Sequence, residues 1–467
     1  MGEPVILADA PGLPRSRLAP PHTDRVTPLN SLPMQSSHFT AAFVAAMLLS
    51  LATQLWLATR QMRHVAAHRG RVPAAFAGTV SLAAHQKAAD YTIAKGRFGL
   101  LSTAVGTAVV IGWTLLGGLD ALNAVLRDAM LPQWGALPYQ LALLASFALI
   151  GSLIELPLDW YSTFRIEQRF GFNRMSLRLW LLDLLKGAAV ATVVGVPLAA
   201  LILWIMAASG GLWWLWAWLA WVAFNLLLLV LYPTVIAPLF NKFEPLADES
   251  LKARVQALMT RCGFAAKGLF VMDGSRRSAH ANAYFTGLGA AKRVVFFDTL
   301  LQRLTAGEVE AVLAHELGHF RHRHVQQRMV GIFGISLAAL ALLGWLAGNA
   351  AFYAGLGVAP NLAAPNDALA LLLFMLAMPA FAFFIAPLLA QVSRKHEFQA
   401  DAYACAHASG SDLANALLKL HEDNAATLTP DPLFVRFYYS HPPASERLAA
   451  LPAPTPTLSA TALAAAA

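Results

Sequence analysis

Seven long apolar stretches constrain the fold of this chain more than any other feature of its sequence. Each is long enough to cross a bilayer as an α-helix, which needs about 20 predominantly apolar residues. Hydrophobic residues make up 57% of the chain and charged residues only 13%, about half the charged share of a soluble protein. We therefore predict an all-α multi-pass membrane protein with seven transmembrane helices. The stretches are Phe39–Thr59, Phe98–Leu119, Leu141–Leu158, Gly187–Ala208, Leu212–Tyr232, Met329–Gly348 and Ala368–Ala390.

Successive connecting segments alternate between many and few Lys and Arg residues. Segment 60–97 holds seven of them and segment 159–186 holds five, whereas segment 120–140 holds one and segment 349–367 none. Because positively charged loops stay in the cytoplasm, the N-terminus is predicted to lie outside. The formal net charge of +8 follows these loops and not one basic helix, so we predict no nucleic-acid partner. The segments predicted to be cytoplasmic are 60–97, 159–186, 233–328 and 391–467.

The insert 233–328 has the pattern of a small α+β domain. Leu251–Cys262 has helical spacing, and Gly268–Met272 is typical of a short strand. Two further β-rich runs, Asn282–Thr286 and Arg293–Phe297, are separated by a Gly-containing turn and predict a hairpin. Thr305 with Glu308 forms a capping-box pattern that starts another helix. No breaker follows, so this helix is predicted to run on into the sixth span.

That last helix carries His315, Glu316 and His319 in an H-E-x-x-H pattern. Positions i and i+4 share one face of a helix, so the two histidines can bind one metal ion. Glu316 lies where a general base acts on the attacking water. The pattern predicts a zinc peptidase of the zincin type, with one Zn²⁺ in each chain.

A catalytic zinc takes three protein ligands, so the chain must supply one more. Two membrane spans after the H-E-x-x-H helix, the chain returns to the same side at Ser393–Asp401. Glu397 is the predicted third ligand, and Asp401 is placed one helical turn later to accept a hydrogen bond from a ligand histidine. His396 is a rival ligand, although its side chain points about 100° away from that of Glu397. The seventh span, which delivers this segment, should bend at Pro379 and Pro387.

Three more residues are candidates for contact with a substrate. His441 could donate a hydrogen bond to the oxyanion that forms when water attacks a peptide carbonyl. Arg447 could hold a substrate carboxylate, or it could pair with Glu446 or another acid. Asn282, at the start of a predicted edge strand, could bond the backbone of an extended substrate; an Asn near a turn can equally be structural.

Together these residues resemble the CAAX prenyl endopeptidase type I family of zinc metalloproteases, over roughly residues 84–450. The resemblance rests on segments that follow the family's order: YTIAKGRFGL, a loop with Glu167, Gly171, Phe172 and Asn173, YPTVIAPLFNKFEPL, HANAYFTG, AHELGHF, EFQAD and SHPPASERL. It implies seven membrane helices around a large water-filled chamber, zinc on His315, His319 and Glu397, and Glu316 as the base. It also implies substrate contacts at Asn282, His441 and Arg447, and removal of the last three residues of a prenylated C-a-a-X tail.

The predicted reaction is zinc-dependent peptide hydrolysis in membrane-associated, and by resemblance prenylated, proteins. One alternative keeps the chemistry but assigns it to membrane-protein quality control without a prenyl requirement. The other is a non-catalytic metal-binding transporter or scaffold. Short loops and Ala-rich composition favour a bacterial inner (plasma) membrane, with membrane lipid and a peptide or protein substrate as partners.

The predicted domain organisation follows the spans and motifs. A disordered tail, 1–38, precedes a five-span membrane region, 39–232. The cytoplasmic catalytic domain with the H-E-x-x-H helix is 233–328, and the sixth and seventh spans are 329–390. The rest of the chain is a C-terminal catalytic segment with the third zinc ligand, 391–450, and a second disordered tail, 451–467.

Overall fold

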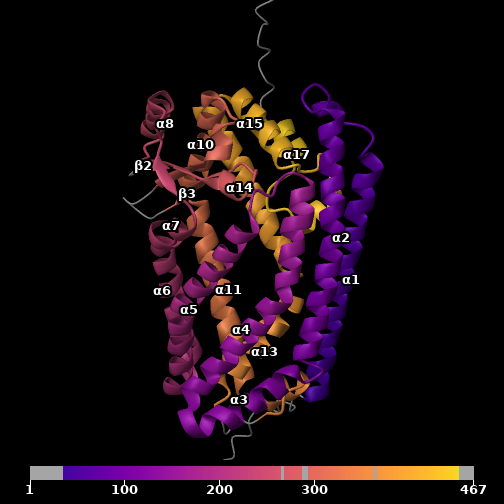
Figure 1. Ribbon diagram of the computed structural model, residues 1–467, viewed down its shortest axis with the longest axis vertical. Helices are drawn as coiled ribbons and strands as arrows, with labels where there is room; N and C mark the ends of the chain where they lie inside the picture. Colours follow the sequence, from indigo (N-terminus) through magenta and orange to yellow (C-terminus); the bar gives the residue numbers. More distant parts are fainter. Residues whose placement is uncertain (1–34, 265–267, 287–292, 361, 363–364, 452–467) are drawn as a thin grey trace, which may run out of the picture.

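Long apolar helices run along the long axis of the molecule, and a small sheet with short helices covers one end of them (Figure 1). The computed structural model describes residues 35–264, 268–286, 293–360, 362 and 365–451, so most of both predicted tails lies outside the described residues. Within the described chain, six helices are long and apolar enough to cross a membrane, and a bent pair supplies a seventh span. The prediction of a seven-span, mainly helical protein with a small α+β domain is therefore confirmed. The six helices are α1 (Ser36–His68), α2 (Leu82–Trp113), α4 (Ala136–Tyr161), α5 (Leu177–Ala208), α6 (Trp213–Leu231) and α11 (His324–Ala347).

Several of these helices are longer than the apolar stretches that predicted them. Helix α2 begins at Leu82, well before Phe98, and the side chain of Ser81 caps it by accepting a hydrogen bond from the Ala84 amide. Helix α5 begins at Leu177 and has a similar cap at Ser176. Apolarity marks only the part of a helix that crosses the bilayer, whereas its polar extension reaches the sheet end of the molecule.

The bend predicted in the seventh span is confirmed. Helices α13 (Asp367–Ala382) and α14 (Ala386–His407) are bent by 66° at a short break between them. Pro379 lies inside α13 and Pro387 lies in the first turn of α14, where its missing N–H costs nothing. The bend turns α14, which carries Glu397, away from the direction of α13.

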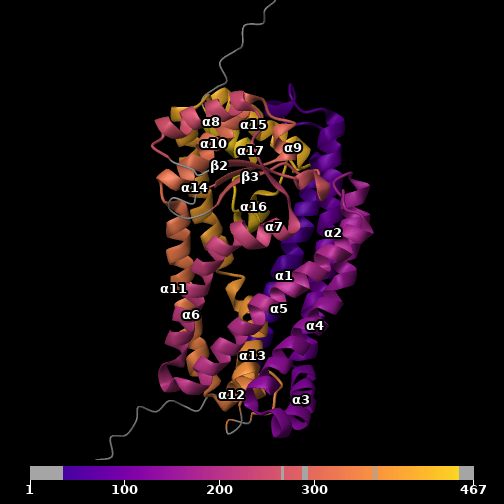
Figure 2. The ribbon, with the colours of Figure 1, turned by 60° about the vertical axis from the view of Figure 1, so that its left-hand side comes forward.

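The end of the bundle opposite the sheet contains two helices that the sequence left as loops. These are α3 (Gly118–Trp134) and α12 (Ala350–Gly355), which Figure 2 shows close together. Gly117 and Gly135 flank α3 with φ angles of +76° and +80°, which a glycine adopts without strain. A buried cluster that includes Phe43, Leu119, Leu143, Tyr353 and Leu373 joins these helices to α1, α4 and α13.

The sheet has the strand order β1-β2-β4-β3. Strands β3 (Ala283–Thr286) and β4 (Arg293–Phe297) pair antiparallel, which confirms the predicted hairpin, although its turn lies outside the described residues. Strand β4 pairs parallel with β2 (Gly268–Met272), and β1 (Phe243–Pro245) covers the other side of β2. Strand β3 is therefore an edge strand, and its free edge can pair with another extended chain.

Short helices pack on this sheet and complete the domain. A second buried cluster, with Val255, Val294, Leu313 and Leu413 among its members, joins them to β4. The remaining helices are α7 (Ala237–Phe240), α8 (Glu249–Arg261), α9 (Asp298–Leu301), α10 (Ala306–Arg321), α15 (Gly410–Asp423), α16 (Pro432–Tyr438) and α17 (Ala444–Ala450).

The predicted continuous helix from the H-E-x-x-H motif into the sixth span is wrong. Helix α10 ends at Arg321 and α11 begins at His324. Between them Arg323 has a φ of +56°, in the left-handed region that a non-glycine residue adopts at some cost. The amide of His322 still donates to the carbonyl of Gly318, so the last turn of α10 keeps its backbone hydrogen bond. The break gives α10 a direction independent of the membrane helix that follows it.

Candidate metal centre and active site

Helix α10 holds two histidines on one face. Its start is fixed by the predicted capping box, in which Thr305 accepts from the amide of Glu308 and the Glu308 carboxylate accepts from the amide of Thr305. One turn apart, His315 and His319 bring their Nε2 atoms to within 3.2 Å of each other. The Nε2 atoms of both rings therefore face the same point.

Helix α14 brings Glu397 to the same position. Its Oε2 atom lies 3.5 Å from His315 Nε2, and its Oε1 atom lies 3.5 Å from His319 Nε2. The ligand atoms of these three residues all lie within 4.8 Å of one another. Glu397 is 3% exposed, and its Oε2 atom has no hydrogen-bond partner among the described residues, with Arg447 Nη1 3.6 Å away as its nearest cation besides His315. A buried carboxylate oxygen without a donor is costly, so the arrangement fits a metal cation between the three side chains.

Asp401 and Arg447 orient the first histidine. His315 Nδ1 donates to Asp401 Oδ1 at 2.8 Å, which leaves Nε2 free to face Glu397. Arg447 binds the same carboxylate with two nitrogens, at 2.8 Å and 2.5 Å. Of the alternatives for Arg447, pairing with another acid is thus observed, whereas Glu446 pairs with Arg394. The sequence could not choose between these acids because the choice depends on how α17 lies against α14.

The electrostatics around the cluster favour a positive charge. Burial opposes protonation of His315, yet Asp401 and Glu397 together raise its pKa to about 9. Burial, with the help of His315, lowers the pKa of His319 to about 4, so the two rings are not charged together. Burial also raises the pKa of Glu316 above its usual value.

A cavity of about 510 Å³ opens onto these groups. Glu316 lines it beside the three ligand candidates, and His441 lies at its rim with Nε2 3.3 Å from Glu397 Oε1. Asn282, exposed and directly before the edge strand β3, also lines it. The Oδ1 atom of Asn282 accepts from the Ala283 amide. The predicted site residues other than Asp401 thus line one cavity, although they come from four separate parts of the chain.

His396, the rival ligand, faces elsewhere. Its ring stacks on His324 with a centroid separation of 4.0 Å and an interplanar angle of 8°. It is not part of the three-residue cluster that could hold a metal among the described residues. The helical rotation between neighbouring positions explains the difference between His396 and Glu397.

Comparison with known proteins matches both halves of the chain. The family model described as "CAAX prenyl protease N-terminal, five membrane helices" matches residues 61–242, and "Peptidase family M48" matches residues 245–455. The CAAX prenyl protease 1 homolog of Arabidopsis thaliana is 31% identical over 88% of this chain and 97% of its own length. The chain belongs to peptidase family M48.

Further relatives of this M48 peptidase extend the match. CAAX prenyl protease 1 of Saccharomyces cerevisiae is 33% identical over 78% of this chain and 85% of its own length. The crystal structure of S. mikatae Ste24p has a TM-score of 0.83 and 29% identity, over 88% of this chain and 98% of that one. The family resemblance seen in the sequence is confirmed, and the chain is a membrane metalloendopeptidase.

The M48 peptidase orients its second histidine through residues that sequence reasoning missed. His319 Nδ1 lies 3.0 Å from His324 Nδ1, and His324 Nε2 lies 2.9 Å from Gln399 Oε1. Because the Gln399 oxygen can only accept, His324 Nε2 carries the proton and its Nδ1 accepts from His319. His319 Nε2 is then unprotonated and faces the cluster. The signal in the sequence was the position of Gln399 inside EFQAD, two residues after Glu397.

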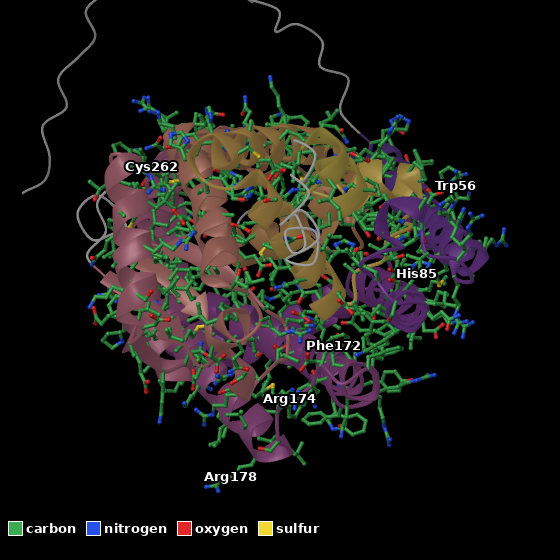
Figure 3. The ribbon with its side chains drawn as sticks, turned by 90° about the horizontal axis from the view of Figure 1, so that it is seen from above. Trp56, His85, Phe172, Arg174, Arg178 and Cys262 are labelled. Carbon is green, nitrogen blue, oxygen red and sulfur yellow. The ribbon has the colours of Figure 1, made fainter. Side chains whose placement is uncertain are left out.

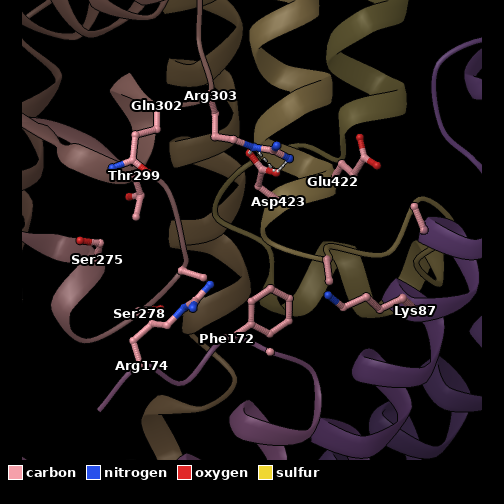
Figure 4. Close-up of a pocket in the computed structure, with 14 residues that line it drawn as sticks. Lys87, Phe172, Arg174, Ser275, Ser278, Thr299, Gln302, Arg303, Glu422 and Asp423 are labelled. Carbon is pink, nitrogen blue, oxygen red and sulfur yellow. Dashed lines mark hydrogen bonds and ion pairs between the residues drawn. The ribbon is translucent and has the colours of Figure 1, made fainter. Parts of the chain in front are cut away.

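A loop of the membrane region supports His280, which lines the catalytic cavity. Phe172 stacks on His280 with a centroid separation of 4.5 Å, and Gly171 permits the approach with a φ of +82°. The Tyr91 hydroxyl donates to Glu167 at 2.6 Å, and His280 lies 3.7 Å from the same carboxylate. A second cavity, of about 620 Å³, lies beside Phe172 (Figure 4). The resemblance had marked Glu167 and Phe172, and the structure uses them as a support for His280.

Gly318 sets the distance between the helices that carry the ligands. A Cβ atom added at Gly318 would lie 2.9 Å from the Cα of Ala400 and 3.1 Å from its carbonyl oxygen. We expect Gly318→Ala to push α14 away, to destabilise the protein by about 1–3 kcal/mol and to lower its metal content. Thermal unfolding and metal analysis of the purified variant measure both effects.

Gly331→Ala is the matched control, because an added Cβ there meets nothing within 4 Å. It should be neutral or stabilising by up to about 1 kcal/mol, the difference in helix propensity between the two residues. A Gly318→Ala variant as stable and as rich in metal as the control would show that the close approach does not hold the site together.

Proposed function

We propose that this chain is a zinc-dependent membrane endopeptidase that cuts proteins near prenylated C-termini. One zinc ion would be held by His315, His319 and Glu397, the set of two histidines and one glutamate that is common in catalytic zinc sites. The observation that carries the proposal is the convergence of these ligand atoms within 4.8 Å at the base of a cavity. The unpartnered Glu397 Oε2 atom supports it, because a metal would satisfy that atom.

The residues around the metal would carry the chemistry. A bound zinc would polarise the scissile carbonyl and acidify the attacking water. Glu316 would take the proton from that water and pass it to the leaving amine, a role that its raised pKa supports. His441, at the rim, would donate to the developing oxyanion. Asp401 and Arg447 would keep His315 in the correct tautomer and orientation.

The free edge of β3 would hold the substrate in extended form. Strand addition supplies main-chain hydrogen bonds that do not depend on sequence, and Asn282 at the start of the strand would add a side-chain bond. Because β3 and the ligand cluster line one cavity, a peptide on this edge would present its backbone to Glu316. We also propose a positioning role for Arg447 in place of the predicted contact with a substrate carboxylate, which its two hydrogen bonds to Asp401 support.

The relatives suggest the class of substrate. The proteins from Arabidopsis thaliana and Saccharomyces cerevisiae are named CAAX prenyl proteases. A membrane enzyme suits such substrates, since a prenyl chain holds them at the bilayer. We therefore propose prenylated C-terminal tails as substrates, with membrane lipid as the second partner.

Peptide cleavage by the purified protein tests the proposal. With zinc, a farnesylated C-a-a-X peptide should lose its last three residues, and a chelator should abolish the reaction until zinc is restored. The same peptide without its prenyl group should be cut more slowly. Mass spectrometry of the products reads out both the rate and the bond that is cut.

The two alternatives predict different outcomes. A quality-control protease would cut an unfolded membrane protein and would cut both peptides equally well. A transporter or scaffold would bind zinc and cut none of these substrates. Either result would contradict the proposed substrate class, and the second would contradict peptide hydrolysis itself.

We further propose that the catalytic domain faces the cytoplasm and the N-terminus the other side. Near the start of α1, Thr40 donates to the carbonyl of Gly355 in α12, at the end of the bundle away from the sheet (Figure 2). A cysteine in place of the exposed Glu249 on α8 should react with an impermeant maleimide only from the cytoplasmic side of sealed vesicles. The bacterial plasma membrane as its location rests on loop lengths and composition and stays a prediction.

A further inference from the structure

A third cavity, of about 510 Å³, lies between α2, the cytoplasmic end of α4 and the short π-helix Ser162–Glu167 that follows α4. We call it the α2–α4 groove, and it shares no lining residue with the catalytic cavity. Its wall is mainly apolar, with Phe98, Leu101, Pro157 and Leu158 among the residues that line it. Three arginines, Arg97, Arg165 and Arg169, complete the lining.

We propose that the α2–α4 groove binds an anionic phospholipid. The first argument is charge. No acidic residue lines the groove, and none of its three exposed arginines has a carboxylate within ion-pair distance in the described chain. Arg169 acts only at longer range on Asp90, whose pKa is lowered mainly by its hydrogen bond to Arg69. Arg165 and Arg169 instead lie 5.6 Å from the aromatic rings of Trp160 and Phe170. Some arginines elsewhere have acidic partners, as Arg60 and Arg303 do with Asp431 and Asp423, and others, such as Arg63, Arg71 and Arg178, have none within the described residues. The groove differs from both groups because three arginines without an ion pair line one apolar cavity.

The second argument is the position of the groove along the membrane helices. Arg97 directly precedes the apolar stretch of α2 that begins at Phe98. The aromatic rings of Trp160 and Tyr161 lie at the matching end of α4, as is typical of a membrane interface. Below them Leu101 is 53% exposed. The arginines therefore lie at headgroup depth, while the apolar wall continues toward the hydrocarbon.

The chemistry of the lining selects among lipids. A phosphate group accepts paired hydrogen bonds from a guanidinium and is attracted to unpaired positive charge. Acyl chains would cover the apolar wall between α2 and α4. A neutral prenyl chain would use the apolar wall and leave the three arginines without a partner. The combined lining thus favours a ligand with both an anionic headgroup and hydrocarbon chains.

The groove also reaches the wall of the active site. Ile166 and Phe170 line the groove, and both belong to a buried cluster with Tyr91 and Phe172. Phe172 stacks on His280, which lines the catalytic cavity. A lipid seated in the groove would stabilise this wall, so binding should raise the temperature of unfolding.

Binding of fluorescent phosphatidylglycerol to the full-length protein in neutral phosphatidylcholine nanodiscs tests the proposal. The triple variant R97Q/R165Q/R169Q should have an affinity for the lipid that is lower by at least roughly tenfold. The reason is that each arginine near a membrane surface adds to the attraction of an anionic headgroup. The control R63Q/R71Q/R178Q removes the same charge from exposed arginines that have no ion pair within the described chain. Figure 3 shows Arg178 at the outer edge of the molecule. The control should bind as the wild type does.

The remaining outcomes separate the possible ligands. Phosphatidylglycerol should raise the unfolding temperature of the wild type and of the control, but not that of the groove variant. A cooperative unfolding transition of the groove variant in neutral lipid shows that this variant is folded. Equal loss of binding in both variants would overturn the proposal in favour of general surface attraction. Competition by soluble glycerophosphoglycerol as strong as by the lipid would overturn it in favour of a phosphate site. Competition by a farnesylated cysteine ester would overturn it in favour of a prenyl site.

Discussion

Replacing Glu316 with Gln is expected to leave zinc bound and to remove nearly all peptide hydrolysis. The amide has the size of the carboxylate but cannot take a proton from the attacking water. General bases typically contribute 10²–10⁴-fold to rate, so we expect a loss of about that size in kcat. Because Glu316 is not one of the three residues whose ligand atoms converge, the metal content should not change. The measurements are kcat on a farnesylated C-a-a-X peptide and zinc content by elemental analysis.

Glu249→Gln provides the control for this prediction. It makes the same chemical change at an exposed position on α8, where the carboxylate pairs with Lys252 in the next turn and with no other cation among the described residues. Its rate and zinc content should match those of the wild type. A Glu316→Gln enzyme that cuts at the wild-type rate would rule out Glu316 as the base.

Replacing Glu397 with Ala is expected to empty the metal site, whereas His396→Ala is expected to leave it intact. Loss of a direct ligand should weaken zinc binding by roughly a hundredfold or more, beyond the effect of removing a residue that only orients a ligand. His396 stacks on His324 and does not face the cluster. Zinc titration of the metal-free proteins, followed by the peptide assay, compares the two variants.

The two variants show which of the neighbouring residues His396 and Glu397 is the third metal ligand. If His396→Ala lost zinc and Glu397→Ala retained it, the third ligand would have been assigned to the wrong residue. If both lost zinc, thermal unfolding of the two metal-free proteins would separate ligand loss from damage to α14. Only selective loss in Glu397→Ala agrees with the observed geometry.

Local patterns in the sequence were enough to predict the parts of the site that lie within one helix or hairpin. The capping box at Thr305, the spacing of His315 and His319 and the β3–β4 hairpin all depend on residues close together in the chain. Glu397 could be placed because two membrane spans return the chain to its starting side. Spans are counted reliably from apolar length, since the bilayer fixes that length.

Other features depend on contacts that no local pattern records. The break at Arg323 occurs in a run without Gly or Pro, and a left-handed arginine is stable only because the surrounding structure imposes it. The choice of Asp401 over Glu446 as the partner of Arg447 follows from the packing of α17 on α14. Helix α3 was not predicted because a membrane span is recognised by continuous apolarity, and α3 carries polar residues along its length.

The two breaks have a mechanical consequence. Helices α10 and α14 carry all three ligand candidates, and each is joined to its membrane span through a break: the turn at Arg323 and the 66° bend between α13 and α14. Transmembrane helices change their tilt when the thickness of the bilayer changes. Here the two joints would allow the spans to tilt, while the tight contact at Gly318 would keep α10 and α14 together. We therefore expect the arrangement of the three ligand candidates to be insensitive to lipid thickness, and the rate of peptide hydrolysis in bilayers of different acyl-chain length measures this.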